Sequence, residues 1–539
     1  MCGIFALFNK FRQITENERI YCNKIQHRGP DNTRYIEFKD GHIVLGFHRL
    51  AINDLSSLGD QPLQLDDSYY LICNGEIYNH RELARKYNII TKSASDCEII
   101  LHLYKKIGIY QTLQQLSGYF AFVLMDVSNN KLIIARDPIG VRALYYSISN
   151  DSGEISVCSE LKGIPIEQHS FVQQFPPGKW LEYDMSTVLP PSMLTYYTYE
   201  YPSIPPSVLS QESQLRKMRC LFENAVDKRF MTDRPFGVFL SGGLDSSLVA
   251  ALVAKKNAPN KIHSFSIGMT GSTDLAKARI VATHIGSIHH EVVVTAQEML
   301  DAQPEVIRAL ETYDTTTIRA GTPMYLLSKY IKENTNIVVV FSGEGSDEAS
   351  GSYLYFHNAP SPNEFQDECV RLLRDLSYFD CLRCDKAVAA NGLEVRVPFL
   401  DTEFLYEYMR VPVEWKQPRD GMEKWFIRQA FEGTGLLPHE ILWRKKEAFS
   451  DGVSSTEKSW FQIIQTHIDS IIPDSEFLNN KDSITHNPPM LKESYYYRKL
   501  FDEYFPGCAH TIPYYWLPKW SGNTADPSAR VLSVYESII

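Results

Sequence analysis

Residues 236–247 constrain the fold of this chain most, because an apolar run ends there abruptly in a glycine-rich turn. The run 236–240 suits a strand buried on both faces, and the apolar residues 248–254 suit a buried helix. The turn between them is therefore a strand-to-helix loop. Adjacent glycines let a backbone approach a ligand closely, and free N–H groups at a helix start attract anions. The sequence predicts a phosphate-binding loop at this point.

This loop is not of the Walker type, because no Gly-Lys-Ser/Thr sequence closes it. Transfer of a γ-phosphate is therefore not the expected chemistry. Asp245 inside the loop indicates a bound Mg²⁺, since carboxylates are preferred ligands of that ion. The same residues also fit an ordinary serine-glycine turn that joins two elements.

A second glycine-serine turn follows a later strand-like run. The runs 261–267, 290–294 and 337–341 alternate with helical stretches, which predicts a parallel α/β sheet. The last run leads into Ser342-Gly343-Glu344-Gly345-Ser346-Asp347-Glu348. Carboxylates repel phosphates unless a cation intervenes, so Asp245 and Asp347 are predicted Mg²⁺ ligands. A solvated acidic loop is the alternative interpretation.

The N-terminal region carries a separate set of candidate catalytic residues. Removal of the initiator methionine would expose the thiol of Cys2 beside its own amine, which can act as the base for a thiolate nucleophile. Asn74 and Gly75 follow a strand-like run and can hold an oxyanion. Arg49 lies in an apolar run and needs a carboxylate partner, and Asp96 can cap a helix or bind an ammonium group. For Cys2 alone, an inert thiol at a strand start is the alternative.

Composition limits the function classes. The net charge of −11 and the lack of a long Lys/Arg run argue against nucleic-acid binding. No window approaches the roughly 18 apolar residues of a membrane span, and no secretory signal pattern is present, so a cytosolic chain is expected. The 10 cysteines do not resemble a disulfide framework. Cys381 and Cys384 form a CxxC pair, interpreted as buried thiols on a helix with a zinc site as the alternative.

A chain of 539 residues predicts several domains or two large ones. Proline-rich segments around residues 175–207 fit neither helices nor central strands, so a boundary is expected there. This gives domains at residues 2–190 and 210–520. The polar residues 521–539 are expected to be loosely held.

Three N-terminal motifs resemble the class II glutamine amidotransferase domain: Cys2-Gly3-Ile4, His27-Arg28-Gly29-Pro30-Asp31 and Asn74-Gly75-Glu76-Ile77-Tyr78-Asn79. The resemblance implies an N-terminal-nucleophile hydrolase with two stacked antiparallel sheets between helices. It also implies that Cys2 attacks the glutamine amide and releases ammonia, with an oxyanion hole at Asn74 and Gly75. Glutamine is then oriented by Arg49, Asn74, Glu76 and Asp96. One departure, Ala143 where the family usually has proline, predicts changed packing.

The two glycine-serine turns resemble the PP-loop (ATP-pyrophosphatase) domain of glutamine-hydrolysing asparagine synthetases, and the similarity extends from Cys2 to about residue 455. Further matching motifs are Glu311-Thr312-Tyr313-Asp314-Thr315-Thr316-Thr317-Ile318-Arg319, Tyr353-Leu354-Tyr355-Phe356-His357, Glu394-Val395-Arg396-Val397-Pro398-Phe399-Leu400-Asp401 and Trp443-Arg444-Lys445-Lys446-Glu447. Two departures are Ala349-Ser350-Gly351-Ser352 in place of Phe-Gly-Gly, and Gly321 in place of serine.

This resemblance implies that the aspartate β-carboxylate attacks the α-phosphate of ATP, giving β-aspartyl-AMP and pyrophosphate. Lys446 is then the cation near pyrophosphate, and Thr316, Thr317 and Arg319 hold aspartate. Glu344 is the expected base for incoming ammonium, with charge balance around Mg²⁺ as the alternative role. The implied ATP-binding residues are Leu240, Ser241, Gly242, Gly243, Asp245, Ser246, Ile267, Ser342, Gly343 and Lys446.

Ammonia must pass between the two sites without meeting water, so a dry route is predicted. The apolar segments 139–141 and 395–400 are its candidate lining, and the second segment also fits ordinary core. The expected partners are aspartate, glutamine and ATP with Mg²⁺, and a homodimer is left open. Three alternatives stay open: a relative that closes a β-lactam or amidates another carboxylate, an ammonia-only synthetase, and a non-catalytic binding protein.

Overall fold

The computed structural model describes residues 1–9, 12–149, 154–165, 171–187, 191–206, 210–455 and 457–538. The chain forms two compact units. The N-terminal unit comprises Met1–Thr198, Met231–Pro235 and Val388–Glu394, and the C-terminal unit comprises Tyr199–Phe230, Phe236–Ala387 and Val395–Ile539. The chain first passes from one unit to the other between residues 198 and 199. A single boundary does not capture the two short segments that belong with the N-terminal unit.

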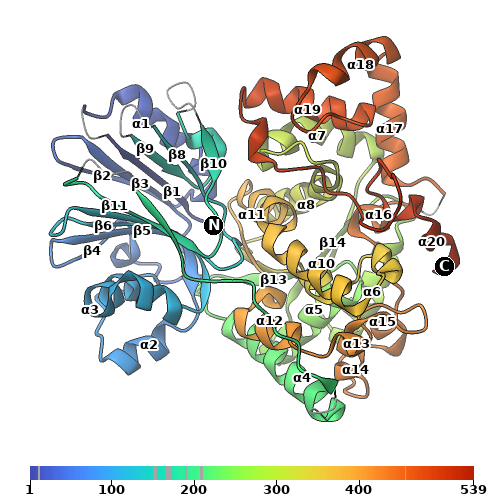
Figure 1. Ribbon diagram of the computed structural model, residues 1–539. Helices are drawn as coiled ribbons and strands as arrows, with labels where there is room; N and C mark the ends of the chain where they lie inside the picture. Colours follow the sequence, from blue (N-terminus) through green and yellow to red (C-terminus); the bar gives the residue numbers. More distant parts are fainter. Residues whose placement is uncertain are drawn as a thin grey trace. The chain divides into compact units, whose positions relative to one another are not determined.

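The N-terminal unit is built on two six-stranded antiparallel sheets (Figure 1). Their strand orders are β10-β8-β9-β1-β3-β2 and β12-β11-β7-β6-β5-β4. The strands are β1 Gly3–Phe8, β2 Asn32–Phe38, β3 Ile43–Arg49, β4 Leu63–Leu65, β5 Tyr69–Ile77, β6 Gly118–Asp126, β7 Lys131–Arg136, β8 Tyr145–Ile148, β9 Ile155–Cys158, β10 Val172–Gln174, β11 Lys179–Asp184 and β12 Ser192–Thr195. The helices are α1 Glu16–Asn23, α2 His80–Tyr87 and α3 Glu98–Gln115.

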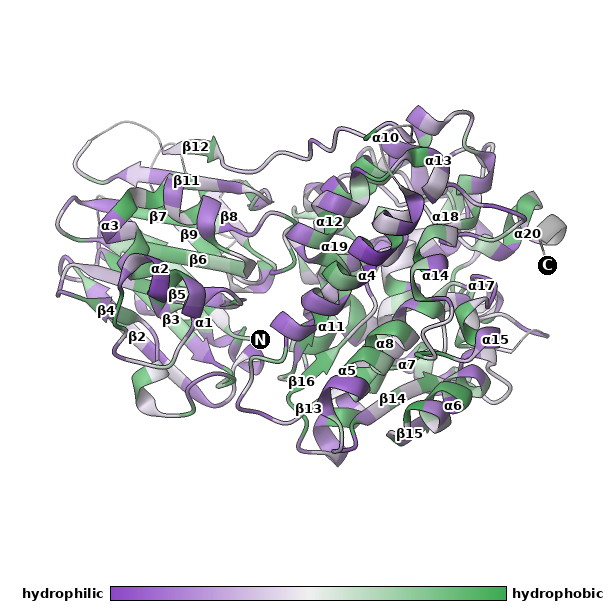
Figure 2. Cartoon of the chain, turned by 90° about the horizontal axis from the view of Figure 1, so that it is seen from below, coloured by the Kyte–Doolittle hydropathy of each residue, from purple (hydrophilic) through white to green (hydrophobic). Residues whose placement is uncertain are grey.

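Strand β6 explains how these layers pack. Successive side chains of a strand point to opposite faces of its sheet. Val123 and Met125 therefore lie in the core between the two sheets, whereas Phe122 and Leu124 pack into the core that includes α2 and α3. All nine residues of β6 are buried, and Figure 2 shows hydrophobic colouring along this strand. The predicted arrangement of stacked antiparallel sheets with helices is confirmed.

The C-terminal unit contains a five-stranded sheet with the order β15-β14-β13-β16-β17. β13 pairs in parallel with both β14 and β16, and β14 pairs in parallel with β15. These strands are β13 Phe236–Phe239, β14 His263–Gly268, β15 Ile288–Val293, β16 Val339–Phe341 and β17 Glu394–Arg396. Adjacent parallel strands end at the same edge of a sheet, so the turns after β13 and β16 become neighbours. The predicted parallel α/β sheet is confirmed.

Helices surround this sheet, and the glycine-rich turn leads directly into α5 (Figure 1). Their bounds are α4 Gln211–Lys228, α5 Leu244–Asn257, α6 Thr273–Ile285, α7 Ala296–Leu310, α8 Thr315–Asn334, α9 Ser346–Ser350, α10 Pro362–Asp375, α11 Asp380–Ala389, α12 Thr402–Met409, α13 Val413–Lys416, α14 Trp425–Phe431, α15 His439–Leu442, α16 Phe449–Gly452, α17 Trp460–Ile471, α18 Asp474–Asn480, α19 Lys492–Tyr504 and α20 Ser533–Ile538. Cys381 and Cys384 are both buried on α11.

The C-terminal segment is held by specific contacts, which corrects the expectation of a loose tail from residue 521. Asp526 accepts bonds from the guanidinium of Arg319 at 2.8 and 3.1 Å. Farther along, the Arg530 guanidinium lies 2.9 Å from Glu447, and Ser528 is buried. The segment is polar, and its polar groups are held by partners within the C-terminal unit.

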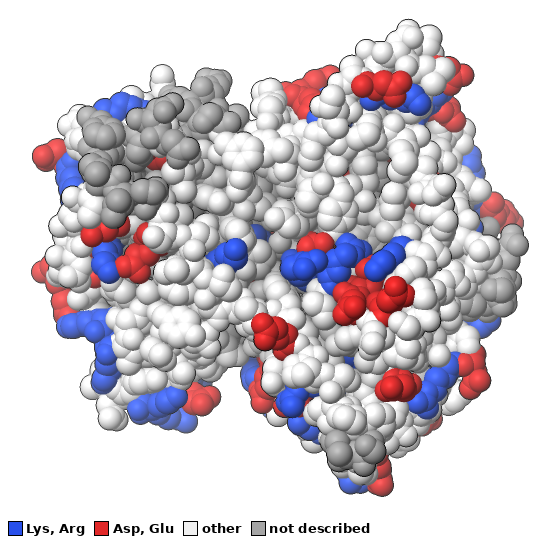
Figure 3. Space-filling model, in the orientation of Figure 1, with Lys and Arg blue, Asp and Glu red and all other residues white. Residues whose placement is uncertain are grey.

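On the face drawn in Figure 3, Lys and Arg side chains of the C-terminal unit lie among Asp and Glu side chains. That part of the surface therefore presents mixed charge and not a continuous basic stripe. Among the helices that the structure describes, none combines the length and the apolar composition needed to cross a bilayer.

Candidate active sites

Cys2 lies at the start of β1, and its surroundings in the N-terminal unit hold both its backbone and its thiol. The Cys2 thiol lies 3.6 Å from the Leu50 carbonyl oxygen, and the Leu50 N–H donates to the sulfur at 3.4 Å. Arg28 donates from Nε to the Cys2 carbonyl at 3.0 Å and pairs with Glu160 at 2.8 Å. The arginine of the predicted His27–Asp31 motif therefore anchors the backbone of the nucleophile.

The protonation state of Cys2 depends on its N-terminal neighbour. The α-amine of Met1 is buried and donates to the Leu393 carbonyl at 2.8 Å. Burial lowers the pKa of this amine to about 5, and burial raises the pKa of the Cys2 thiol to about 11. With Met1 in place, the amine that would activate Cys2 is part of a peptide bond. Release of Met1 is therefore required for the predicted base to exist.

Asn74 and Gly75, the predicted oxyanion-hole residues, lie on β5. The Asn74 Nδ2 is buried and has no hydrogen-bond partner among the described residues. Buried donors are rarely left unpaired, so this one is suited to an acceptor brought by a substrate. A Cβ at Gly75 would lie 2.3 Å from the Tyr119 carbonyl oxygen, so the β5–β6 pairing here requires glycine.

Glu76 and Asp96 are brought together by Asn53, a residue that the sequence analysis missed. The Asn53 amide donates to Glu76 Oε2 at 2.5 Å and to Asp96 Oδ1 at 3.2 Å. The Ile77 N–H donates to Asp96 Oδ2 at 2.6 Å, and burial raises the pKa of Asp96. Asn53 belongs to no recognisable motif, so only the tertiary structure reveals it.

Arg49 is buried and already has a carboxylate partner within the N-terminal unit. Its NH1 donates to Asp60 Oδ1 at 2.6 Å and to the Ser56 carbonyl at 2.7 Å. The predicted need for a carboxylate is therefore met by the protein itself. A substrate carboxylate would have to share this guanidinium with Asp60.

In the C-terminal unit, the two glycine-serine turns touch each other. A Cβ at Gly343 would lie 2.6 Å from the backbone nitrogen of Ser246, so glycine permits this close approach. Gly242 has a φ of +73°, and a Cβ there would lie 2.5 Å from the backbone nitrogen of Ala278. Gly242 therefore shapes the turn against α6.

The turns form the wall of one cavity. Of the predicted ATP-binding residues, those that line it are Leu240, Ser241, Gly243, Asp245, Ser246, Ile267, Ser342, Gly343 and Lys446. Gly242 does not line it. Thr316, Glu344 and Asp347 also line the cavity, together with Tyr353, Asp380, Arg383 and Lys424, to which the sequence analysis assigned no role.

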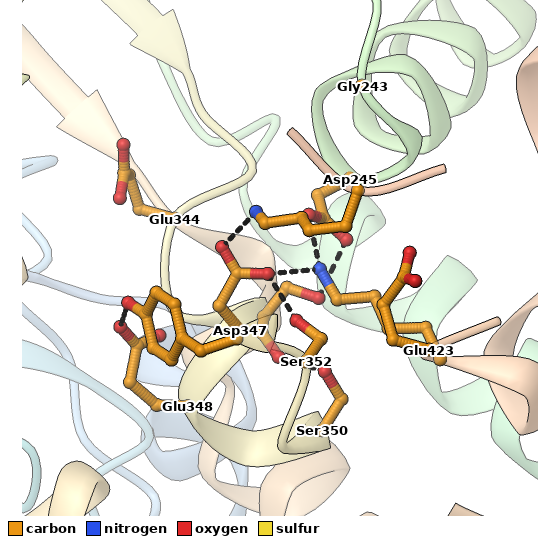
Figure 4. Close-up of polar contacts among 12 residues, drawn as sticks. Gly243, Asp245, Glu344, Asp347, Glu348, Ser350, Ser352 and Glu423 are labelled. Atoms are coloured by element: carbon orange, nitrogen blue, oxygen red, sulfur yellow. Dashed lines mark hydrogen bonds and ion pairs between the residues drawn. The ribbon is translucent and has the colours of Figure 1, made fainter. Parts of the chain in front are cut away.

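Asp245 and Asp347 converge on one cationic atom (Figure 4). The Lys424 Nζ lies 2.5 Å from Asp245 Oδ2 and 2.5 Å from Asp347 Oδ1. The Lys446 Nζ lies 2.5 Å from Asp347 Oδ2. Burial opposes ionisation of Asp347, but the two ammonium groups hold the pKa of this carboxyl well below its usual range. Both carboxylates therefore face a common cation position.

This donor set fits Mg²⁺ that is bound together with phosphates. Mg²⁺ commonly takes one or two protein carboxylates and completes its octahedron with waters and substrate phosphates. The two aspartates supply that number of carboxylates. In the described part of the chain, no group of three or more His, Cys, Asp or Glu residues could hold a metal ion without such help.

Glu344 lies in the same cavity beside Arg383, which is on α11. The Arg383 NH2 donates to Glu344 Oε2 at 2.7 Å and also bonds Asp380. Burial raises the pKa of Glu344, and the Arg383 charge opposes that rise. The hydroxyl of Thr316 is buried without a partner among the described residues. The cavity thus offers a carboxylate base, a guanidinium and an unpaired hydroxyl.

Arg319 and Thr317 do not line this cavity, which corrects their predicted contact with aspartate. Arg319 donates to Glu493 at 2.8 and 2.6 Å and also pairs with Asp526. The Thr317 hydroxyl donates to Asp314 at 2.8 Å, at the N-cap of α8. Two carboxylates of the protein occupy the guanidinium, so its bidentate partners are structural.

The departures from the family pattern have local explanations. The Ser352 hydroxyl donates to Asp347 Oδ1 at 2.5 Å, so this serine adds a contact that glycine cannot make. A Cβ at Gly321 would lie 2.5 Å from Leu310 Cδ1, which leaves little room for a serine side chain. Ala143 is buried, and nothing in the structure explains the absence of proline there.

Comparisons with known proteins cover the whole chain. A family model described as "Glutamine amidotransferase domain" matches residues 1–195, and one described as "Asparagine synthase" matches residues 217–367 and 358–531. Over 564 residues, the chain is 45% identical to the glutamine-hydrolyzing asparagine synthetase of Gallus gallus, covering 100% of both chains. The Homo sapiens enzyme of that name is 45% identical over 566 residues, again covering 100% of both chains.

The folds and the two sites define an amidotransferase that joins a glutaminase domain to an ATP-using synthetase domain. The extent and the level of identity allow a narrower statement. The chain belongs to the family of glutamine-hydrolysing asparagine synthetases.

Proposed function

We propose that this chain forms asparagine from aspartate, glutamine and ATP, releasing glutamate, AMP and pyrophosphate. One observation supports the synthetase half most strongly. Two glycine-serine turns meet in one cavity, where Asp245 and Asp347 face a single cation position and Glu344 lies beside Arg383. This arrangement supports binding of a nucleotide next to a second anionic substrate.

In the glutaminase half, the Cys2 thiolate attacks the side-chain amide of glutamine. The Asn74 Nδ2 and the Gly75 N–H stabilise the negative oxygen that develops, since preorganised donors act most strongly where charge appears. Glu76 and Asp96 hold the ammonium group of glutamine, and Arg49 holds its carboxylate. Ammonia is released when the acyl-enzyme forms, and water then frees glutamate.

In the synthetase half, backbone N–H groups and serines of the two turns hold the phosphates. A Mg²⁺ held by Asp245 and Asp347 would neutralise charge between the phosphates and the attacking β-carboxylate. Lys446 faces the departing pyrophosphate. With Arg319 engaged by two carboxylates, Arg383 and Thr316 are the proposed contacts to aspartate. Glu344 accepts a proton from the incoming nitrogen nucleophile.

The remaining predictions concern transfer, location and assembly. Ammonia in water at neutral pH becomes ammonium and loses its nucleophilic lone pair, so a dry route stays part of the proposal, with residues 139–141 and 395–400 as its candidate lining. A cytosolic location is tested by fractionation of the source cells. A homodimer is tested by light scattering of the purified chain.

The direct test is product analysis with purified protein, ATP and Mg²⁺. Asparagine, AMP and pyrophosphate are expected in equal amounts, and each is expected to depend on both aspartate and glutamine. Formation of ADP and phosphate would contradict adenylation. If another carboxylic acid replaced aspartate efficiently, the runner-up amidation would be favoured. Synthesis from ammonium but never from glutamine would identify an ammonia-only enzyme.

A further inference from the structure

Lys424 occupies an unusual place in the synthetase cavity, because its ammonium group lies where a metal ion would be expected. Its Nζ is 2.5 Å from one oxygen of Asp245 and 2.5 Å from one oxygen of Asp347. The Lys424 side chain is only 1% exposed, so water contributes little to its solvation. The two aspartates are its main anionic partners.

The backbone at Lys424 is strained in a way that supports a functional position. Its φ of 57° and ψ of 25° lie in the left-handed region, at the N-cap of α14. Residues other than glycine, asparagine and aspartate rarely adopt this backbone conformation, and those that do cluster at ligand sites. The neighbouring Glu423 carboxylate is paired with Arg428 and does not satisfy the lysine.

All four carboxylate oxygens of the aspartate pair accept hydrogen bonds in this structure (Figure 4). Asp245 Oδ1 accepts from Ser346 at 2.8 Å, and Asp245 Oδ2 accepts from Lys424. Asp347 Oδ1 accepts from Lys424 and from Ser352, and Asp347 Oδ2 accepts from Lys446. Lysine ammonium groups therefore bond three of the four oxygens to which a metal ion would bind.

We propose that Lys424 is an internal counter-cation, which holds the cation position between Asp245 and Asp347 while the site is empty and yields it when nucleotide enters. This inference rests on the proposed function, since it assigns a role to the same aspartates. It implies that the divalent ion and the nucleotide bind together. Neither ligand is expected to bind tightly without the other.

The charge balance explains the coupling. Two ammonium groups, Lys424 and Lys446, balance two carboxylates. A divalent ion that arrived alone would therefore add two uncompensated positive charges to this group of side chains. Phosphate oxygens that arrive with the ion offer both lysines replacement anions. Linkage makes the effect reciprocal, because each ligand then strengthens binding of the other.

The test measures binding and does not depend on turnover. Free Mn²⁺ is followed by electron paramagnetic resonance as it is titrated into the full-length protein, first alone and then with α,β-methylene-ATP. Wild-type protein is expected to bind Mn²⁺ tightly only with the nucleotide analogue. Lys424→Met is expected to bind Mn²⁺ alone roughly tenfold or more tightly than wild type, because the competing charge is gone.

Matched variants test whether the gained Mn²⁺ affinity arises at the aspartate pair. Lys256→Met removes one exposed lysine from the far end of α5 and is expected to leave Mn²⁺ binding unchanged. Lys424→Met combined with Asp347→Asn is expected to lose the gained affinity. Lys424→Gln, with a shorter neutral side chain, provides a second variant if Lys424→Met is unfolded by circular dichroism.

Two outcomes would overturn the proposal. The first is tight Mn²⁺ binding by the nucleotide-free wild type, and the second is unchanged Mn²⁺ affinity in both folded Lys424 variants. Neither outcome concerns the products of the reaction. Failure of asparagine synthesis in the product assay would instead reject the proposed function, so the two failures are distinguishable.

Discussion

The Asn74 amide in the N-terminal site and the Asp245–Asp347 pair in the C-terminal site differ in how their polar atoms are partnered. In the N-terminal unit, the buried Nδ2 of Asn74 has no partner among the described residues. In the C-terminal unit, Asp245 and Asp347 are fully engaged by lysines and serines. An unpaired amide donor costs far less to bury than an unpaired charge, which explains the difference. A site that binds a neutral amide can keep an unpaired donor before its substrate binds. A site that binds anions must instead contain charges that balance one another.

The first prediction concerns Cys2, the proposed nucleophile of the N-terminal site. Cys2→Ala is expected to lower glutamine-dependent synthesis by on the order of 10³-fold or more, because no other group replaces the nucleophile. Synthesis from ammonium is expected to persist, since it needs only the C-terminal site. Asparagine formation is measured with each nitrogen source. Cys220→Ala, at an exposed cysteine, is the control, and retained glutamine use by Cys2→Ala would reject the nucleophile.

The second prediction separates catalysis from stability at the open site. Asn74→Ala is expected to lower glutaminase turnover by roughly 10²- to 10³-fold, the cost of one oxyanion donor. Its free energy of unfolding is expected to change by less than about 1 kcal/mol, because removal of Nδ2 breaks no hydrogen bond to another described residue. Glutamate release and urea denaturation measure the two effects. A large loss of stability would show that the amide is structural.

The third prediction concerns pH at the charge-balanced site. Glu344 acts as a base only when ionised, and burial has already raised its pKa while the Arg383 charge opposes the rise. Arg383→Gln removes that charge, so the pKa of Glu344 rises further and the acid limb of synthesis moves to higher pH. The pH profile of ammonium-dependent synthesis is measured at constant free ammonia.

Arg383→Lys is the control for that profile, because it retains the positive charge. Its acid limb is expected to stay close to that of the wild type. If Arg383→Gln left the limb in place, Glu344 would not be the titrating base.

The smallest expected effect comes from a residue particular to this chain. Ser352→Gly restores the family's glycine and removes the hydroxyl bonded to Asp347. One hydrogen bond to a charged group contributes about 1.5–3 kcal/mol at most, and Lys424 and Lys446 still hold the carboxylate. The Mg²⁺ concentration for half-maximal synthesis is therefore expected to change by several-fold, with glutaminase activity unaltered. An unchanged Mg²⁺ requirement would show that Ser352 does not position this carboxylate.

Local patterns indicate many of the residues proposed for both candidate sites. The glycine-serine turns are recognisable because strand, turn and helix follow one another along the chain, and parallel pairing brings the two turns together. Cys2, Asn74 and Gly75 belong to short motifs whose geometry is set by neighbouring residues. The fold class followed from the same signals, since period and turn chemistry are local properties.

Long-range partners could not be predicted in this way. Arg319 lies 174 positions from Glu493, and nothing in the sequence states which of many carboxylates it meets. Lys424 reaches the cavity from a segment without a recognised motif, and Arg383 lies within the Cys381–Cys384 pair, which gives no indication of its role. The polar composition of the C-terminal segment predicts a loosely held tail, whereas its Asp526 is held by a buried guanidinium.

In the proposed reaction, one chain liberates nitrogen at one site and adenylates aspartate at the other. The most direct measurement combines two labels, aspartate with ¹⁸O in its β-carboxylate and glutamine with ¹⁵N in its side-chain amide, followed by mass spectrometry of the products. Adenylation of the β-carboxylate predicts ¹⁸O in the phosphate of AMP, and nitrogen transfer from glutamine predicts ¹⁵N in the amide of asparagine. AMP without ¹⁸O, or asparagine without ¹⁵N, would contradict it.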